Sequence, residues 1–205
     1  DEKDEKKKAD EAWKDATPEI KKEIMDFAEG YMRFLDDAKT EREAVRTIVS
    51  MADAAGFRNI NDAAELKPGD CVYGVNKNKS IYLAVIGKQP LTQGFNAVGA
   101  HIDAPRLDLK QNPLYEDSGL ALLKTHYYGG IKKYQWTTVP LALHGVVALT
   151  DGTVVDVKIG EDENDPVFLV TDLLPHLAAK QNAKKLAEGV PAENLNILIG
   201  SMPGE

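Results

Sequence analysis

Apolar residues early in the chain recur with the period of an α-helix. After Pro18 they lie three or four positions apart, which predicts a helix with one buried face: Ile20, Ile24, Phe27, Tyr31 and Leu35. Thr17, directly before Pro18, is typical of an N-cap with proline in the first turn. Thr40 and Glu43 have the spacing of a capping box. They predict a second helix that ends near Gly56.

Beyond residue 60 the pattern becomes that of β-strands. Residues 71–75 and 80–86 are rich in β-branched and aromatic side chains and flank a polar turn, which predicts a hairpin. Residues 95–102 are small and apolar, as in a strand that is covered on both faces. Residues 107–111 are expected to continue the sheet beyond a bend at Pro105.

The second half of the chain is predicted to be richer in strands. Strands are expected at residues 120–127, 139–149, 154–159 and 196–200, with a hairpin turn at Asp151-Gly152. Asp172 is a candidate N-cap for a helix that continues to Leu186. Asn112-Pro113 and the acidic turn at residues 116–119 interrupt the pattern. We therefore expect an α/β segment over residues 1–114 and a β-rich segment over residues 115–205.

The composition narrows the classes of function. The chain has 205 residues and a formal net charge of -8, which argues against nucleic-acid binding because that needs a basic surface. The single cysteine, Cys71, cannot form an intrachain disulfide and favours a cytoplasmic location. No stretch of the sequence is apolar enough to span a membrane, so no membrane partner is expected.

His101 and Asp103 are the most informative polar pair. They lie two positions apart near the end of the predicted strand at residues 95–102, so both side chains should lie on one face. A neutral imidazole is a good zinc ligand, and a nearby carboxylate can orient it and raise its basicity. On the pattern alone, a structural hydrogen-bonded pair at a strand end is the more frequent explanation, because a lone His-x-Asp is common.

The remaining histidines do not complete a zinc motif. A zinc site needs at least three protein ligands, and His126, His144 and His176 have no ligand spacing among them. His144 is expected to be structural within its strand. His126 is expected either to face a pocket or to end a strand, and His176 to pack at the start of a helix. Phosphate-loop and serine-nucleophile motifs are missing from the sequence.

Four longer strings, in order along the chain, carry a family resemblance. They are residues 99–110 (GAHIDAPRLDLK), 125–136 (THYYGGIKKYQW), 139–147 (VPLALHGVV) and 173–178 (LLPHLA). Together they resemble the aspartyl aminopeptidase/aminopeptidase I family of two-zinc metalloaminopeptidases, over most of residues 20–205. The resemblance implies an α/β fold: an incomplete metallopeptidase α/β domain at residues 1–114, followed by a β-rich inserted dimerisation domain at residues 115–205.

The resemblance also implies roles for three residues. His101 corresponds to a metal ligand, and Asp103 to the catalytic-site carboxylate that orients it. His176 corresponds to an intersubunit contact that helps to complete a neighbour's substrate-binding pocket. The implied cofactor is zinc, with two divalent metals in a complete site, and manganese or cobalt as alternatives. The implied partners are peptide substrates and further copies of the chain, in a homo-oligomer built from dimers.

The sequence departs from the family's pattern in one large respect. The family's later metal ligands and its general base follow the inserted domain, and residues 112–205 contain no matching Asp-Asp or Glu-Glu pair. The first residue is Asp, and residues 201–205 follow the last predicted strand directly. We therefore expect an N-terminal portion of the enzyme that is inactive alone. The alternative is a non-catalytic self-association module.

Overall fold

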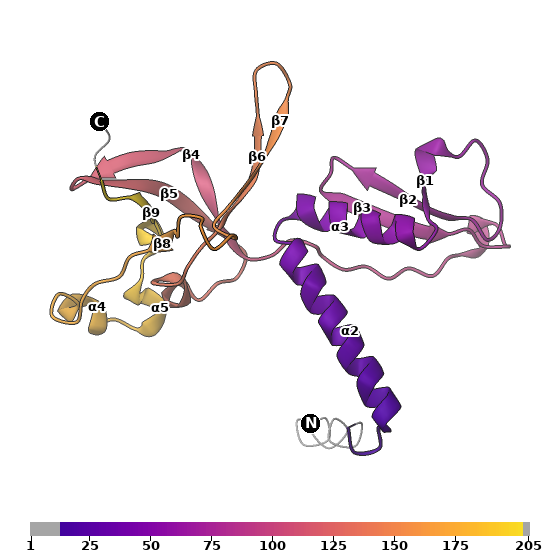
Figure 1. Ribbon diagram of the computed structural model, residues 1–205, viewed down its shortest axis with the longest axis horizontal. Coiled ribbons are helices and arrows are strands. Elements are labelled where there is room, and N and C mark those ends of the chain that lie inside the picture. Colours follow the sequence, from indigo (N-terminus) through magenta and orange to yellow (C-terminus); the bar gives the residue numbers. More distant parts are fainter. Residues whose placement is uncertain (1–12, 203–205) are drawn as a thin grey trace. The chain divides into compact units, whose positions relative to one another are not determined.

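The computed structural model describes residues 13–202, so the first twelve residues and the last three, on which the expectation of truncation partly rests, lie outside the described residues. The chain divides into two compact units, one through Ile102 and the other from Asp103 onward (Figure 1). Helices and several sheets occur together, which confirms the predicted α/β class. None of the helices within residues 13–202 combines the length and the apolarity that crossing a bilayer requires.

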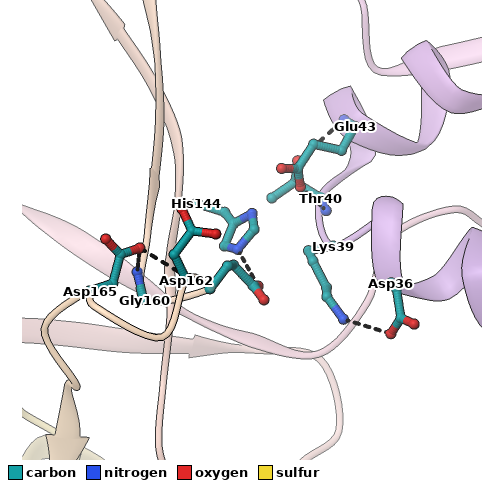
Figure 2. A network of polar contacts seen from close by, with 9 residues as sticks. Asp36, Lys39, Thr40, Glu43, His144, Gly160, Asp162 and Asp165 are labelled. Carbon is teal, nitrogen blue, oxygen red and sulfur yellow. Dashed lines mark hydrogen bonds and ion pairs between the residues drawn. The ribbon is translucent and has the colours of Figure 1, made fainter.

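The first unit begins with the two predicted helices, α2 (Pro18–Asp37) and α3 (Glu41–Ala54). Thr17 caps α2 by accepting a hydrogen bond from the amide of Ile20. The capping box of α3 is present, with Thr40 and Glu43 bonded reciprocally (Figure 2). Both predicted helix starts are confirmed because local side-chain chemistry determines them.

The predicted burial of the α2 face is wrong for the described residues. No residue of α2 is buried, and Phe27 is 78% exposed. α2 contacts α3 and extends away from the sheet of its own unit (Figure 1). An amphipathic pattern predicts an apolar face, but burial of that face also needs a second layer that covers it. Residues 13–102, the described part of this unit, do not cover the apolar face of α2.

The sheet of the first unit contains the predicted hairpin. Its strands are in the order β1 (Arg58–Asn59), β2 (Cys71–Asn76) and β3 (Ser80–Val85), with β2 and β3 antiparallel. Two short 3-10 helices occur in this unit: η1 (Ile60–Asp62) lies between β1 and β2, and η2 (Leu91–Gln93) follows β3. α3 lies along this sheet (Figure 1). Its residues Ala44, Val45 and Ala52 are buried, as are Val72 and Tyr73 of β2.

The predicted strand at residues 95–102 is wrong. The chain has no regular secondary structure from residue 94 to residue 105, Phe95 is 77% exposed, and Val98 is fully exposed. A strand covered on both faces needs neighbouring strands and layers above and below it. Within residues 13–202 no strand pairs with this segment. The apolar composition of residues 95–102 is therefore not sufficient to form a β-strand.

The second unit contains a four-stranded antiparallel sheet. The strand order is β4 (Arg106–Asp117), β5 (Leu120–Tyr128), β9 (Ile197–Gly200) and β8 (Leu169–Val170). Ser118 and Gly119, with φ of 54° and 76°, form the turn between β4 and β5. Within the predicted break at residues 112–119, residues 112–117 belong to β4, whose register shifts between Leu109 and Leu114, and only Ser118 and Gly119 form the turn. The boundary at residues 114/115 therefore falls inside β4. Which family domain each segment represents stays a prediction.

A separate hairpin consists of β6 (Leu143–Ala148) and β7 (Val154–Ile159), joined at the predicted Asp151-Gly152 turn. The long helix predicted after Asp172 is wrong: two helical segments of four residues form instead, α4 (Ala179–Asn182) and α5 (Leu186–Gly189). Pro175 has no amide hydrogen and disfavours a helical conformation in the residue before it, so the chain turns here. Short 3-10 helices occur at η3 (Lys133–Trp136) and η4 (Ala192–Asn194).

The core of the second unit lies beneath β5, β8 and β9. It is formed by Val170, Val190, Leu195 and Ile197, with Leu107, Tyr127 and Trp136 among the partly buried residues packed against it. The buried Thr125 hydroxyl donates a hydrogen bond to the carbonyl of Leu195. These contacts fix the inward-facing side chains of β5. Its other face carries the exposed Lys124, His126 and Tyr128.

Candidate functional site

Two of the four family-like strings are neighbours in the sheet of the second unit. β4 carries the end of the first string and β5 the start of the second, and the two strands pair antiparallel. In this register Arg106 lies opposite Tyr128, and Asp108 lies opposite His126. The register therefore places polar residues from both strings at one end of the sheet, next to the segment that carries Asp103.

His101 and Asp103 both precede β4. His101 is exposed at the end of the first unit, and Asp103 is half-buried at the start of the second. Because neither residue lies in a strand, the argument that alternation places them on one face does not apply. Their roles as ligand and orienting carboxylate stay predictions.

The Asp103 carboxylate is held from β5. The Tyr128 hydroxyl donates a hydrogen bond of 2.8 Å to Asp103 Oδ2. The Arg106 guanidinium lies 4.2 Å from the centre of the Tyr128 ring, within the range of a cation–π contact. Arg106 Nε in turn donates a hydrogen bond of 2.7 Å to Asp108 Oδ1. A connected polar group thus runs from Asp103 to Asp108.

Gly129, directly after β5, lies against Pro105 in the segment that precedes β4. Its φ is 79°, a conformation that favours glycine, and a Cβ placed there would lie 3.5 Å from Pro105 Cα. The glycine follows Tyr128 directly. The close approach of Gly129 and Pro105 therefore keeps the backbone of residues 103–106 beside the end of β5.

Tyr128 and Arg106 are not among the site residues predicted from the sequence. Both residues lie within the quoted strings, but neither forms a spacing motif with Asp103. The signal that could have found them is the strand register, which aligns position 106 with position 128 once a hairpin turn is placed at Ser118-Gly119. The turn was instead interpreted as a domain boundary.

The other histidines have separate surroundings. His126 is exposed on β5, with its ring stacked at 5.6 Å on that of Tyr127. His144 Nε2 lies 2.7 Å from Glu161 Oε1 (Figure 2), which agrees with the structural role expected for it. His176 is exposed in a turn at residues 175–177, not in a helix, so the predicted helix-start packing is wrong. Its role in a substrate pocket stays a prediction.

The acidic loop after β7 is also shown in Figure 2. The Asp165 carboxylate accepts hydrogen bonds from the backbone amides of Gly160, at 2.7 Å, and Asp162, at 3.4 Å. These bonds, that from Gly160 first, lower the pKa of Asp165 below its ordinary value. The Asp165 carboxylate therefore stabilises the loop at residues 160–165 by accepting hydrogen bonds from its backbone.

The donor chemistry of His101 and Asp103 suits zinc, but only as part of a site. An imidazole and a carboxylate are both common around zinc, and a stable site takes at least three protein ligands. Residues 13–202 contain no cluster of three or more His, Cys, Asp or Glu side chains that could hold a metal ion. A zinc ion bound at His101 would therefore need ligands beyond those that the described residues bring together.

The four family-like strings all lie within a region of the chain that matches a known family. Residues 34–203 match the family described as Aminopeptidase I zinc metalloprotease (M18). A probable M18 family aminopeptidase 1 of Clostridium acetobutylicum is 53% identical over 196 residues, which are 94% of this chain and 42% of that protein. The chain thus spans about two fifths of the length of the curated relatives it matches.

Solved structures agree with the fold. An M18 aminopeptidase from Thermotoga maritima superposes with a TM-score of 0.85 and 45% identity, over 93% of this chain and 41% of that one. A more distant structure, an S. cerevisiae mApe1 dodecamer, has a TM-score of 0.64 and 18% identity over 86% of this chain and 39% of that one. At that identity it supports the fold alone.

Proposed function

The chain belongs to the M18 family of aminopeptidase I zinc metalloproteases, and from this premise we propose that the protein removes N-terminal residues from peptides in a zinc-dependent reaction. The observation that carries the proposal is the family match over residues 34–203, supported by 53% identity to a bacterial M18 aminopeptidase. The proposal concerns the whole protein, since the chain covers 42% of that relative.

Within this proposal His101 supplies one metal ligand, and Asp103 orients its imidazole. The exposure of His101 supports the first role, because a ligand must be reachable by a metal. The hydrogen bond from Tyr128 supports the second, because an orienting carboxylate must itself be held. Zinc, when bound, would polarise the scissile carbonyl and lower the pKa of an attacking water. Two metals per complete site, with manganese or cobalt as substitutes, remain part of the proposal.

The proposal extends to assembly and location. We place the N-terminal part of the catalytic domain at residues 1–114 and the dimerisation domain at residues 115–205, with His176 at an intersubunit contact beside the substrate. A homo-oligomer built from dimers is supported by three exposed valines on the β6–β7 hairpin, Val147, Val154 and Val155. The single cysteine supports a cytoplasmic location.

The test is peptide hydrolysis by the full natural protein. Release of N-terminal acidic and neutral residues should depend on zinc and stop with a chelator. His101→Ala should lower the rate by about a hundredfold or more and reduce the bound zinc, as expected when an imidazole ligand is lost. His144→Gln is the matched control and should retain both the rate and the zinc. Unchanged hydrolysis in His101→Ala would contradict the assigned ligand, and no zinc-dependent hydrolysis at all would contradict the function.

A further inference from the structure

We infer that Tyr128 is a positioning residue for Asp103, with Arg106 and Asp108 fixing Tyr128 in place. The inference rests on the proposed function, in which Asp103 orients a metal-binding imidazole. It deepens that function by naming the group that holds the carboxylate, a residue that lies 25 positions further along the chain, at the end of β5.

The need for such a group follows from the backbone around Asp103. Residues 94–105 carry no ladder hydrogen bonds, and Asp103 lies only three residues before the start of β4. An aspartate side chain rotates about two bonds, so an irregular backbone leaves its carboxylate plane undetermined. A carboxylate that orients an imidazole must keep that plane fixed. A contact from the adjacent sheet can provide this fixation, and Tyr128 makes such a contact.

Tyr128 satisfies this need from a rigid position. It is the last residue of β5, and the β4–β5 ladder continues to the Arg106–Tyr128 pair. Behind it, Thr125 and Tyr127 anchor the inner face of β5 to the core of the second unit. The phenol reaches Asp103 Oδ2 at 2.8 Å, a normal distance for a hydroxyl donating to a carboxylate.

Arg106 holds the Tyr128 ring in place. Its guanidinium lies 4.2 Å from the ring centre, and its Nε bond to Asp108 at 2.7 Å holds the guanidinium in one plane. Asp108 therefore acts on Asp103 through two intermediates, and the four side chains form one connected group.

The first experiment detects the contact without zinc. The 205-residue chain contains seven tyrosines, and carbon-13 labelling of the tyrosine Cζ gives one resonance for each. Tyr128→Phe identifies its resonance by loss. Asp103→Ala should shift that same resonance, because the hydroxyl loses its charged acceptor. An unmoved Tyr128 resonance in Asp103→Ala would overturn the inference.

The second experiment measures zinc affinity in the full natural protein by competition with a chelator. Tyr128→Phe keeps the ring under Arg106 and removes only the hydroxyl, and it should weaken zinc binding by about tenfold, as expected for loss of a group behind a ligand. Tyr115→Phe is the matched control: it lies on β4 with the Lys124 ammonium 5.1 Å from its ring centre, and it should leave zinc binding unchanged.

A double-mutant cycle separates positioning from general stability. If Tyr128 acts through Asp103, Tyr128→Phe should cause no further loss of zinc affinity in an Asp103→Ala background. An equal loss in both backgrounds, together with a lowered unfolding temperature, would mean a structural role and would overturn the inference. If His101→Ala leaves zinc binding intact, the proposed ligand fails, whereas the tyrosine resonance still decides whether Tyr128 holds Asp103.

Discussion

Gly129 has a left-handed backbone conformation and lies against Pro105, two residues after Asp103. Its φ of 79° lies in the left-handed region, and a Cβ would meet Pro105 Cα at 3.5 Å, an ordinary contact. Strain in Gly129→Ala should therefore come from the backbone, at about 1–2 kcal/mol. Hydrogen exchange of the β4 and β5 amides should reveal this loss of local stability.

Gly130→Ala provides the comparison for that substitution. A Cβ at Gly130 would meet no heavy atom within 4 Å, so the exchange rates should remain close to those of the wild type. Equal effects of the two alanines would show that flexibility after β5, and not the left-handed turn, is what the segment requires.

The stability of the loop held by Asp165 is expected to depend on pH. The amides of Gly160 and Asp162 lower its pKa, so its stabilising effect on the loop is complete above the ordinary value of about 3.8 and is lost as the pH falls through the lowered value. The nitrogen-15 shift of the Gly160 amide should titrate in that acidic range. Asp165→Asn should abolish the titration, and Asp162→Asn should retain it; a titration that survives in Asp165→Asn would assign it to another group.

Among the elements, the N-terminus of α3 depends on its capping box. Thr40→Ala removes the hydroxyl that accepts from the Glu43 amide and donates to the Glu43 carboxylate, at a cost of about 1 kcal/mol, while the backbone amide of residue 40 still donates to that carboxylate. Far-UV circular dichroism during urea unfolding should show an earlier loss of helix. Ser50→Ala, exposed later in the same helix, is the matched substitution. A midpoint shift as large in Ser50→Ala would indicate that helix propensity dominates.

The same elements show what a sequence can predict. Thr17, Thr40 and the Asp151-Gly152 turn act over three or four residues, and the structures predicted from them are confirmed. The strand at residues 95–102 and the burial of α2 depend on partners distant in sequence, and both predictions are wrong for the described residues. The helix after Asp172 was predicted from its candidate N-cap, and that local signal does not outweigh Pro175, which interrupts a helix three residues later.

For the candidate site, the quoted strings predicted His101 and Asp103 as a pair, and the structure adds what lies beside Asp103. Tyr128 and Arg106 meet through a strand register that depends on the Ser118-Gly119 turn. A spacing rule cannot detect the Asp103–Tyr128 contact, because 25 residues separate the two partners and the intervening turn sets their alignment. The ligand and pocket roles of His101 and His176 remain predictions.

At the scale of the whole molecule, the irregular stretch at residues 94–105 joins two units that each have their own sheet. A protease must bind several residues in an extended form, so exposed side chains within helices are poor sites and exposed irregular segments are good ones. Brief chymotrypsin treatment of the 205-residue chain should therefore cut after Phe95, 77% exposed in this stretch, before it cuts after Phe27, 78% exposed within α2. Mass spectrometry of the first fragments identifies the site, and Phe95→Ser should delay cleavage while Phe27→Ser should not. First cleavage inside β2–β3 or β4–β5 would mean that the units open more readily than the stretch that joins them.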